Sequence, residues 1–142
     1  MNKPVKAISG FLGISMFMFG ILKFVNPFKG WYMTQVEMSE LPFQELSYWA
    51  GQFGEILVGA LFLLLIFYRN FFKPSTHFGL FTLANLATVI MMCITVYVHI
   101  HPSVPNEVLP LKIKPPVIPI VFGTLPVVNW TLYQLKPSAS NT

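Results

Sequence analysis

The sequence is short of charged residues, and this shortage defines the class of protein. Only 10% of its 142 residues are charged, whereas 54% are hydrophobic. A typical soluble domain has about 25% charged residues. The composition therefore excludes an ordinary soluble domain and indicates an integral membrane protein.

The chain also lacks the residues that several common chemistries need. Cys93 is the only cysteine, which excludes an intrachain disulfide and a redox pair of cysteines. The basic residues are scattered, so we expect no nucleic-acid partner. Motifs for a serine or cysteine nucleophile, a phosphate loop or a dinucleotide site are missing. The sequence therefore argues against an autonomous enzyme and leaves open the role of an oxidoreductase subunit.

Four apolar stretches are long enough to cross a membrane, which takes about 20 residues per helix. They cover residues 5–25, 49–68, 78–98 and 115–133. Runs such as residues 56–67 have no polar face, which argues against a soluble bundle. We predict one all-α domain over residues 1–142, an integral membrane four-helix bundle.

The connections between these stretches differ in character. Residues 26–47 mix aromatic and polar side chains, which fits either a short interfacial helix or a spacer with aromatic anchors. Residues 99–114 are too rich in proline for a regular helix. We expect this second connection to form a loop over the outer mouth of the bundle.

Charge is distributed unequally between the two sides that four crossings create. The charged residues on one side are all basic, whereas the other side holds four acidic residues together with lysines. The first group is Lys3, Lys6, Arg69, Lys73 and Lys136, and the acidic group is Glu37, Glu40, Glu45 and Glu107. The positive-inside rule then places both termini in the cytoplasm. We expect an integral protein of the plasma membrane, in a bacterial cell, with the lipid bilayer as its main partner.

Glu55 is the only acidic residue within an apolar stretch. A charge inside a bilayer costs several kcal/mol or more unless it is paired or faces a polar cavity, so it is a candidate site residue. Lys23 ends the first stretch at a similar depth, and an ion pair would relieve the desolvation of both groups. Alternatively, Lys23 snorkels to the headgroups, and Glu55 contacts a hydroxyl group or water.

The neighbours of Glu55 along its helix suggest a pocket and a packing face. Gln52 lies three residues earlier, on a neighbouring part of the same face, and could line a polar pocket with Lys23 and Glu55. Gly54 and Gly59 favour close helix packing. Asn85, in the third stretch, is typical of a hydrogen bond between membrane helices.

His99 and His101 stand at the outer end of the third stretch. On a helix, residues two apart point in different directions, so they can share a metal only if the helix ends by His99. Typical histidine-based metal sites have three or four ligands, and His77 lies on the other side of the membrane. We therefore expect no metal. Either of the two outer histidines could exchange protons with Glu55, because imidazole titrates near neutral pH.

The first stretch ends in Gly20-Ile21-Leu22-Lys23-Phe24, and the second contains Gly54-Glu55-Ile56-Leu57-Val58-Gly59. Together with the four spans, these two short motifs resemble the DoxX-like family of four-helix integral membrane proteins. The resemblance covers most of the chain. It implies the four-helix fold more firmly than an activity, because members of the family differ in role. Some resemble subunits of a thiosulfate to quinone oxidoreductase, others take part in membrane redox complexes, and related animal proteins act as receptor-assembly chaperones.

Two hypotheses for function follow. In the first, the protein is a subunit of a membrane redox complex and binds a quinone or another lipophilic small molecule through Glu55, Lys23 and Gln52. In the second, it is a non-enzymatic assembly or scaffold protein, in which Lys23 and Glu55 form a structural ion pair. Other membrane proteins or further copies of the chain are the expected protein partners. Proton-coupled transport fits less well, because four short helices without an inverted repeat leave little room for alternating access.

Overall fold

A computed structural model describes residues 1–135, and this part of the chain is helical, without a strand. The α-helices are α1 (Lys3–Leu22), α2 (Phe28–Met38), α3 (Gln44–Phe67), α4 (Pro74–Ile100) and α5 (Val117–Gln134). Short 3-10 turns are η1 (Arg69–Phe71), η2 (Asn106–Val108) and η3 (Pro110–Lys112). The rest of the predicted domain, including Lys136, lies outside the described residues.

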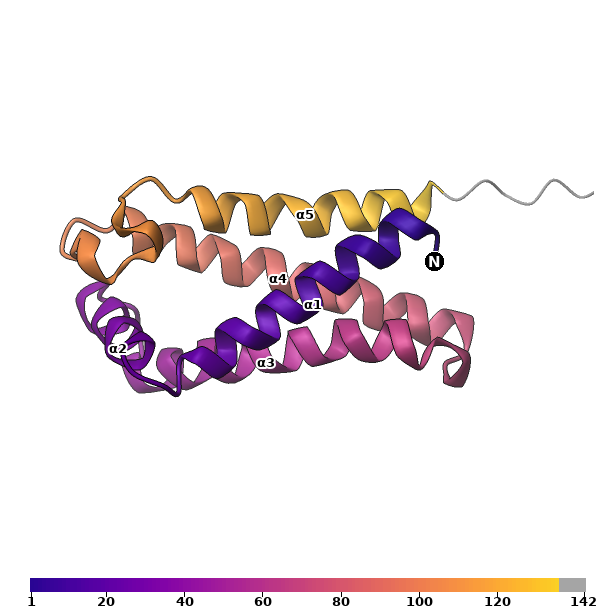
Figure 1. Ribbon diagram of the computed structural model, residues 1–142, viewed down its shortest axis with the longest axis horizontal. Helices are drawn as coiled ribbons and strands as arrows, with labels where there is room; N and C mark the ends of the chain where they lie inside the picture. Colours follow the sequence, from indigo (N-terminus) through magenta and orange to yellow (C-terminus); the bar gives the residue numbers. More distant parts are fainter. Residues whose placement is uncertain (136–142) are drawn as a thin grey trace, which may run out of the picture.

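Four of the described helices, α1, α3, α4 and α5, are long and apolar enough to cross a membrane. This confirms the predicted all-α membrane bundle. In Figure 1, α1 crosses α3 diagonally, and α4 runs beside α5. The α2 helix and the connection between α4 and α5 cover one end of the bundle. The N-terminus, the turn between α3 and α4, and the last turn of α5 lie at the opposite end.

The helix bounds differ from the apolar stretches in the sequence. The α3 helix begins at Gln44 rather than at residue 49, and α4 begins at Pro74 rather than at residue 78. In contrast, α1 ends at Leu22, three residues before its apolar stretch ends. Hydropathy detects apolar side chains, whereas a helix continues for as long as its backbone hydrogen bonds do. Residues 26–47 contain the helix α2, which is one of the two forms expected for this connection.

Glycine allows α1 and α3 to approach closely. A Cβ atom on Gly59 of α3 would collide with backbone atoms of Gly13 and Phe17 in α1. A Cβ atom on Gly20 of α1 would lie 2.9 Å from the backbone oxygen of Gln52. The predicted role of Gly59 in helix packing is therefore confirmed.

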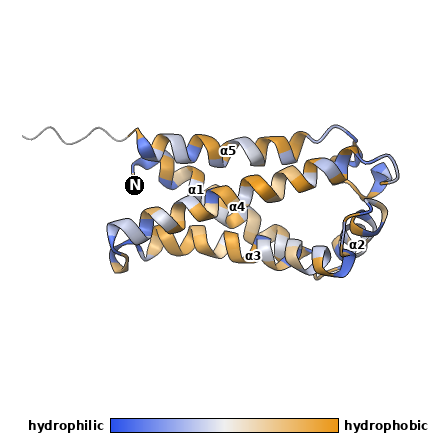
Figure 2. Cartoon of the chain, turned by 180° about the vertical axis from the view of Figure 1, so that it is seen from behind, coloured by the Kyte–Doolittle hydropathy of each residue, from blue (hydrophilic) through white to orange (hydrophobic). Residues whose placement is uncertain are grey.

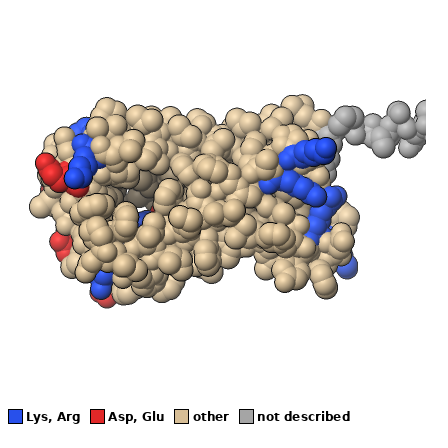
Figure 3. All heavy atoms as spheres, in the orientation of Figure 1, with Lys and Arg blue, Asp and Glu red and all other residues tan. Residues whose placement is uncertain are grey.

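The surface separates into an apolar middle and two charged ends. Figure 2 shows hydrophobic residues dominating the long helices, and Figure 3 shows the charged side chains gathered at the two ends. Large apolar side chains on the outside include Leu57, which is 67% exposed. Such a surface is suited to contact with lipid, so the chain is a membrane-embedded protein. The cytoplasmic location of the termini stays a prediction.

A buried polar cluster joins α1, α4 and α5. The Nδ2 atom of Asn129 donates hydrogen bonds to Ser9 Oγ (3.0 Å) and Asn85 Oδ1 (3.1 Å). Asn85 in turn donates to the backbone oxygen of Phe81, 2.7 Å away. The predicted role of Asn85 in joining helices is confirmed, and this cluster fixes α5 against the rest of the bundle.

An apolar core adjoins this cluster in the bundle. It is built from residues of all four long helices, namely Leu12, Met16, Val58, Phe62, Ala84, Met92 and Phe122. Met92 and Phe122 also line a cavity beneath α2. The core thus positions one wall of the candidate site.

Candidate functional site

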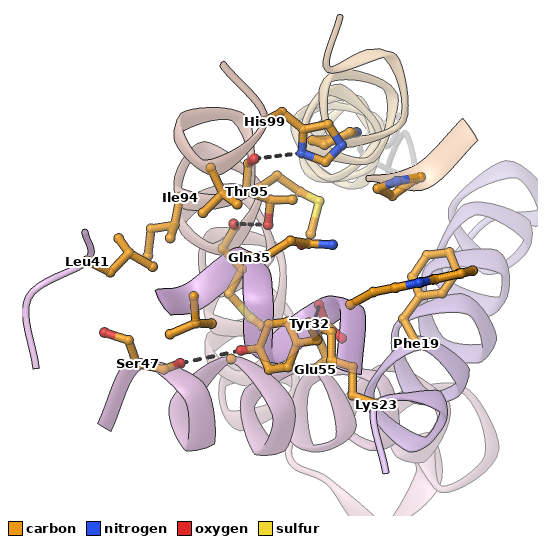
Figure 4. A pocket seen from close by; sticks show the side chains of 18 of the residues that line it. Phe19, Lys23, Tyr32, Gln35, Leu41, Ser47, Glu55, Ile94, Thr95 and His99 are labelled. Carbon is orange, nitrogen blue, oxygen red and sulfur yellow. Dashed lines mark hydrogen bonds and ion pairs between the residues drawn. The ribbon is translucent and has the colours of Figure 1, made fainter. Parts of the chain in front are cut away.

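A cavity of about 610 Å³ lies beneath α2, within the range of about 300–1,000 Å³ that is usual for small-molecule sites. All five α-helices and the connections on either side of α2 contribute to its walls. Side chains that line it and are labelled in Figure 4 include Phe19, Lys23, Tyr32, Gln35, Glu55, Thr95 and His99. Met92 and Phe122 also line it. Most of the remaining lining residues are apolar. The cavity is therefore suited to a ligand that is mainly apolar and carries a few polar atoms.

The cavity is partly open on one face. Figure 3 shows the molecule hollowed between α1 and α5, next to α2. Lining residues on these two helices are Phe19 and Leu22 of α1 and Ile118, Pro119 and Phe122 of α5. The ring centroids of Phe19 and Phe122 are 5.5 Å apart, and Phe122 also belongs to the apolar core. The opening thus lies between two helices of the apolar belt.

The predicted contact between Lys23 and Glu55 is confirmed. Lys23 Nζ lies 2.6 Å from Glu55 Oε1, and the two side chains are 17% and 8% exposed. Lys23 is the residue that follows α1, so its side chain reaches α3 from the end of a helix. The other carboxylate oxygen, Oε2, is buried and has no hydrogen-bond partner within residues 1–135. The carboxylate therefore keeps capacity to accept a hydrogen bond.

Tyr32 of α2 completes the surroundings of Lys23, a contact that no motif in the sequence predicts. Lys23 Nζ lies 4.1 Å from the centre of the Tyr32 ring. The Tyr32 hydroxyl donates to the backbone oxygen of Tyr48, 3.0 Å away. Burial, and next the charge of Glu55, raise the pKa of this hydroxyl above its usual value, so it stays protonated. The glycine at position 51 leaves room for the Tyr32 side chain, because a Cβ atom there would collide with the Tyr32 hydroxyl.

Hydrogen bonds fasten α2 and the proline-rich loop over the cavity. Gln35 Nε2 donates to the backbone oxygen of Val108, and the Tyr97 hydroxyl donates to the backbone oxygen of Ser39, 3.1 Å away. Lys114 Nζ donates to the backbone oxygens of His101 and Val104. The loop is ordered around 3-10 turns and contains no regular α-helix, as predicted. The end of the cavity beneath α2 is therefore held in place from both sides.

His99 and His101, at the end of α4, separate as expected for a continuing helix. The α4 helix extends through Ile100, so only His99 is among the cavity-lining residues. His99 Nδ1 lies 2.9 Å from the backbone oxygen of Thr95, whereas the ring of His101 packs against Tyr97. Within residues 1–135, no group of three His, Cys, Asp or Glu side chains could hold a metal ion. Proton exchange between Glu55 and His99, which line the same cavity, stays a prediction.

Gln52 is placed differently from Lys23 and Glu55. Its side chain is 1% exposed, and neither of its amide atoms has a hydrogen-bond partner within the described part of the chain. Gln52 is not among the residues that line the cavity, because this turn of α3 packs against Gly20 of α1. The structure therefore brings Lys23 and Glu55 together at the cavity, while Gln52 is buried outside the cavity wall.

Comparisons of the chain with family models, curated proteins and solved structures give no match. The resemblance to DoxX-like proteins therefore stays a prediction.

Proposed function

We propose that this protein binds a lipophilic small molecule with a polar aromatic head, such as a quinone or hydroquinone, in the cavity beneath α2. The apolar and aromatic walls hold the ring and its substituents. The Lys23–Glu55 pair provides the polar contact. We further propose that the protein does so as a DoxX-like binding subunit of a redox complex in the plasma membrane.

The observation that carries this proposal is the position of Glu55. Its side chain lines a largely apolar cavity, while one of its oxygens is buried without a hydrogen-bond partner in residues 1–135. An unsatisfied buried polar group costs about 1–3 kcal/mol, and more when it is charged. A ligand that donates a hydrogen bond to the carboxylate would offset that cost. Ionisable groups at membrane depth are functional candidates for this reason.

The opening between α1 and α5 supports a ligand that comes from the bilayer. Apolar side chains of both helices, such as Phe19 and Ile118, line the cavity. A lipophilic molecule dissolved in the membrane can reach this opening without crossing water. A hydrophilic solute would instead have to pass the covered end, where Gln35 bonds to Val108.

Mass spectrometry of organic extracts tests the proposal. Wild-type protein is purified gently beside E55Q and the control E45Q, which changes an exposed carboxylate at the start of the same helix. We expect one lipophilic compound to be enriched above bulk lipid in wild type and E45Q, and depleted in E55Q. Equal enrichment in E55Q, or no enriched compound in any sample, contradicts the proposed function.

A second function, membrane assembly without a bound substrate, is favoured by the same ion pair. Lys23 and Glu55 connect α1 to α3 at 2.6 Å, so they could serve only to hold these helices together. The charge swap K23E/E55K separates the two functions, since it restores the attraction with the charges exchanged. Recovered stability and unchanged ligand content point to a structural pair. Lost ligand in a stable swapped protein points to the binding site.

A further inference from the structure

The formal charges in the cavity wall balance each other. Among the described residues that line the cavity, only Lys23 and Glu55 carry a formal charge, and Lys23 Nζ lies 2.6 Å from Glu55 Oε1. Figure 4 shows this pair beside Tyr32 at one side of the cavity, away from His99. An imidazole that titrates near about pH 6.5 is mostly uncharged at about pH 8. At that pH the wall therefore carries no net charge.

Without Glu55, the ammonium group of Lys23 would be a binding site for anions. The side chain of Lys23 is 17% exposed and that of Glu55 is 8% exposed, so the lysine is the more accessible member of the pair. A cation among apolar walls attracts an anion strongly, because little water screens the attraction. Membranes contain anionic lipids, whose hydrocarbon chains suit the apolar walls. The carboxylate of Glu55 already neutralises this cation from within the protein.

We propose that Glu55 determines the specificity of the cavity by restricting it to uncharged lipophilic molecules and excluding anionic ones. This inference rests on the proposed function, because it specifies the ligand class of the same cavity. A neutral molecule leaves the ion pair intact, and its oxygen can accept a hydrogen bond from a further N–H group of Lys23. An anion must displace Glu55 from Lys23 or share the ammonium group with it. In both cases one negative charge stays buried without compensation, which is costly.

Two probes that differ in charge test this selection. An alkylbenzenesulfonate is an anion at any working pH, and the matching alkylphenyl methyl sulfone has the same ring and tail and no charge. A benzoquinone with the same tail serves as the reference for the proposed site. Binding is measured to the intact protein in nanodiscs of zwitterionic lipid at about pH 8, and empty nanodiscs correct for partition. We expect wild type to bind the sulfone at least about tenfold more tightly than the sulfonate, which corresponds to about 1.4 kcal/mol.

Removing the charge of Glu55 should create binding of the anion. In E55Q, the amide is close in size to the carboxylate and leaves Lys23 without a counter-charge. We expect E55Q to bind the sulfonate at least about tenfold more tightly than wild type does, by the same charge argument. The double variant K23M/E55M lacks the cation as well, so it should bind the sulfonate no better than wild type. The control E45Q, which changes an exposed carboxylate, should keep the wild-type preference.

Each outcome has a distinct meaning. Preference for the sulfone in wild type, together with gain of sulfonate binding in E55Q, supports the inference. If wild type binds the sulfonate as tightly as the sulfone, the inference is overturned while the quinone site stands. A folded E55Q protein that gains no sulfonate binding also overturns it, because Glu55 is then not the determinant. E55M, which removes the same charge, replaces E55Q if that variant does not fold. If the benzoquinone does not bind above the empty nanodiscs, the proposed function itself fails.

Discussion

The ammonium group of Lys23 holds both the carboxylate of Glu55 and the ring of Tyr32. Its Nζ atom is 2.6 Å from Glu55 Oε1 and 4.1 Å from the centre of the Tyr32 ring. These three residues come from the end of α1, from α3 and from α2. A single cation therefore organises the part of the cavity where the short helix covers the bundle.

Removing only the cation should destabilise the protein. In K23M, Glu55 loses its charge partner while it remains largely buried. Breaking a buried ion pair on one side costs about 3–5 kcal/mol. We expect about 3 kcal/mol here, because Lys23 is partly exposed, measured as a lower free energy of unfolding in detergent. Unchanged stability in K23M would contradict the buried pair.

The double variant K23M/E55M separates stability from binding. Apolar residues of similar volume often replace a buried ion pair without loss of stability, so we expect the double variant to unfold within about 1 kcal/mol of wild type. It should nevertheless lose the enriched lipophilic compound. A stable double variant that retains this compound would mean that the ion pair is not part of the ligand site.

Gly51 should be intolerant of even a methyl group. In G51A, the added Cβ atom collides with the Tyr32 hydroxyl, so Tyr32 must move from Tyr48 and Lys23. Overpacking of this kind costs about 1–3 kcal/mol. The control is G79A in α4, where no heavy atom lies within 4 Å of the added Cβ. Thermal unfolding of both variants checks the prediction, and equal midpoints for G51A and wild type would contradict it.

The sequence predicts the helices well because their signal is local. Twenty apolar residues identify a span wherever it lies, and a carboxylate at membrane depth stands out by its cost. Glu55 and its pairing with Lys23 could therefore be predicted from depth and charge alone. The helix ends could not, since Gln44 and Pro74 begin helices in polar sequence.

The remainder of the site depends on contacts between distant segments. Tyr32 reaches Lys23 only because α2 folds back under the loop that holds Val108. No periodicity in residues 26–47 predicts the direction in which α2 runs. The helix face that Gln52 shares with Glu55 predicts that Gln52 lies at the pocket. The structure instead packs its turn against α1 at Gly20, a contact set by the crossing of two helices.

Gly59 should be the most sensitive position in the contact between α1 and α3. A methyl group in G59A would collide with the α1 backbone at Gly13 and Phe17, and a backbone cannot move aside as a flexible side chain can. We expect a loss of about 3 kcal/mol, at the upper end of the range for overpacking. Chemical unfolding beside G79A provides the measurement. A G59A protein as stable as G79A would contradict the close approach of these helices.

The buried cluster around Asn129 should contribute modestly to stability. N129L removes its hydrogen bonds to Ser9 and Asn85. Hydrogen bonds between membrane helices average about 0.6 kcal/mol, so we expect a loss of about 1 kcal/mol for the two bonds. The control T131V removes an exposed hydroxyl that bonds within its own helix. A larger loss in T131V than in N129L would contradict the role of this cluster.

Photo-crosslinking in nanodiscs tests the central claim most directly, namely that the cavity beneath α2 holds a lipophilic ring. The probe is a hydroquinone with a photoactivatable alkyl tail, and the labelled peptides are mapped by mass spectrometry. We expect labels near Phe19, Met92 and Phe122, all of which line the cavity, and their loss in K23M/E55M. Labels confined to outward side chains such as Leu57, at equal levels in both proteins, would contradict the account.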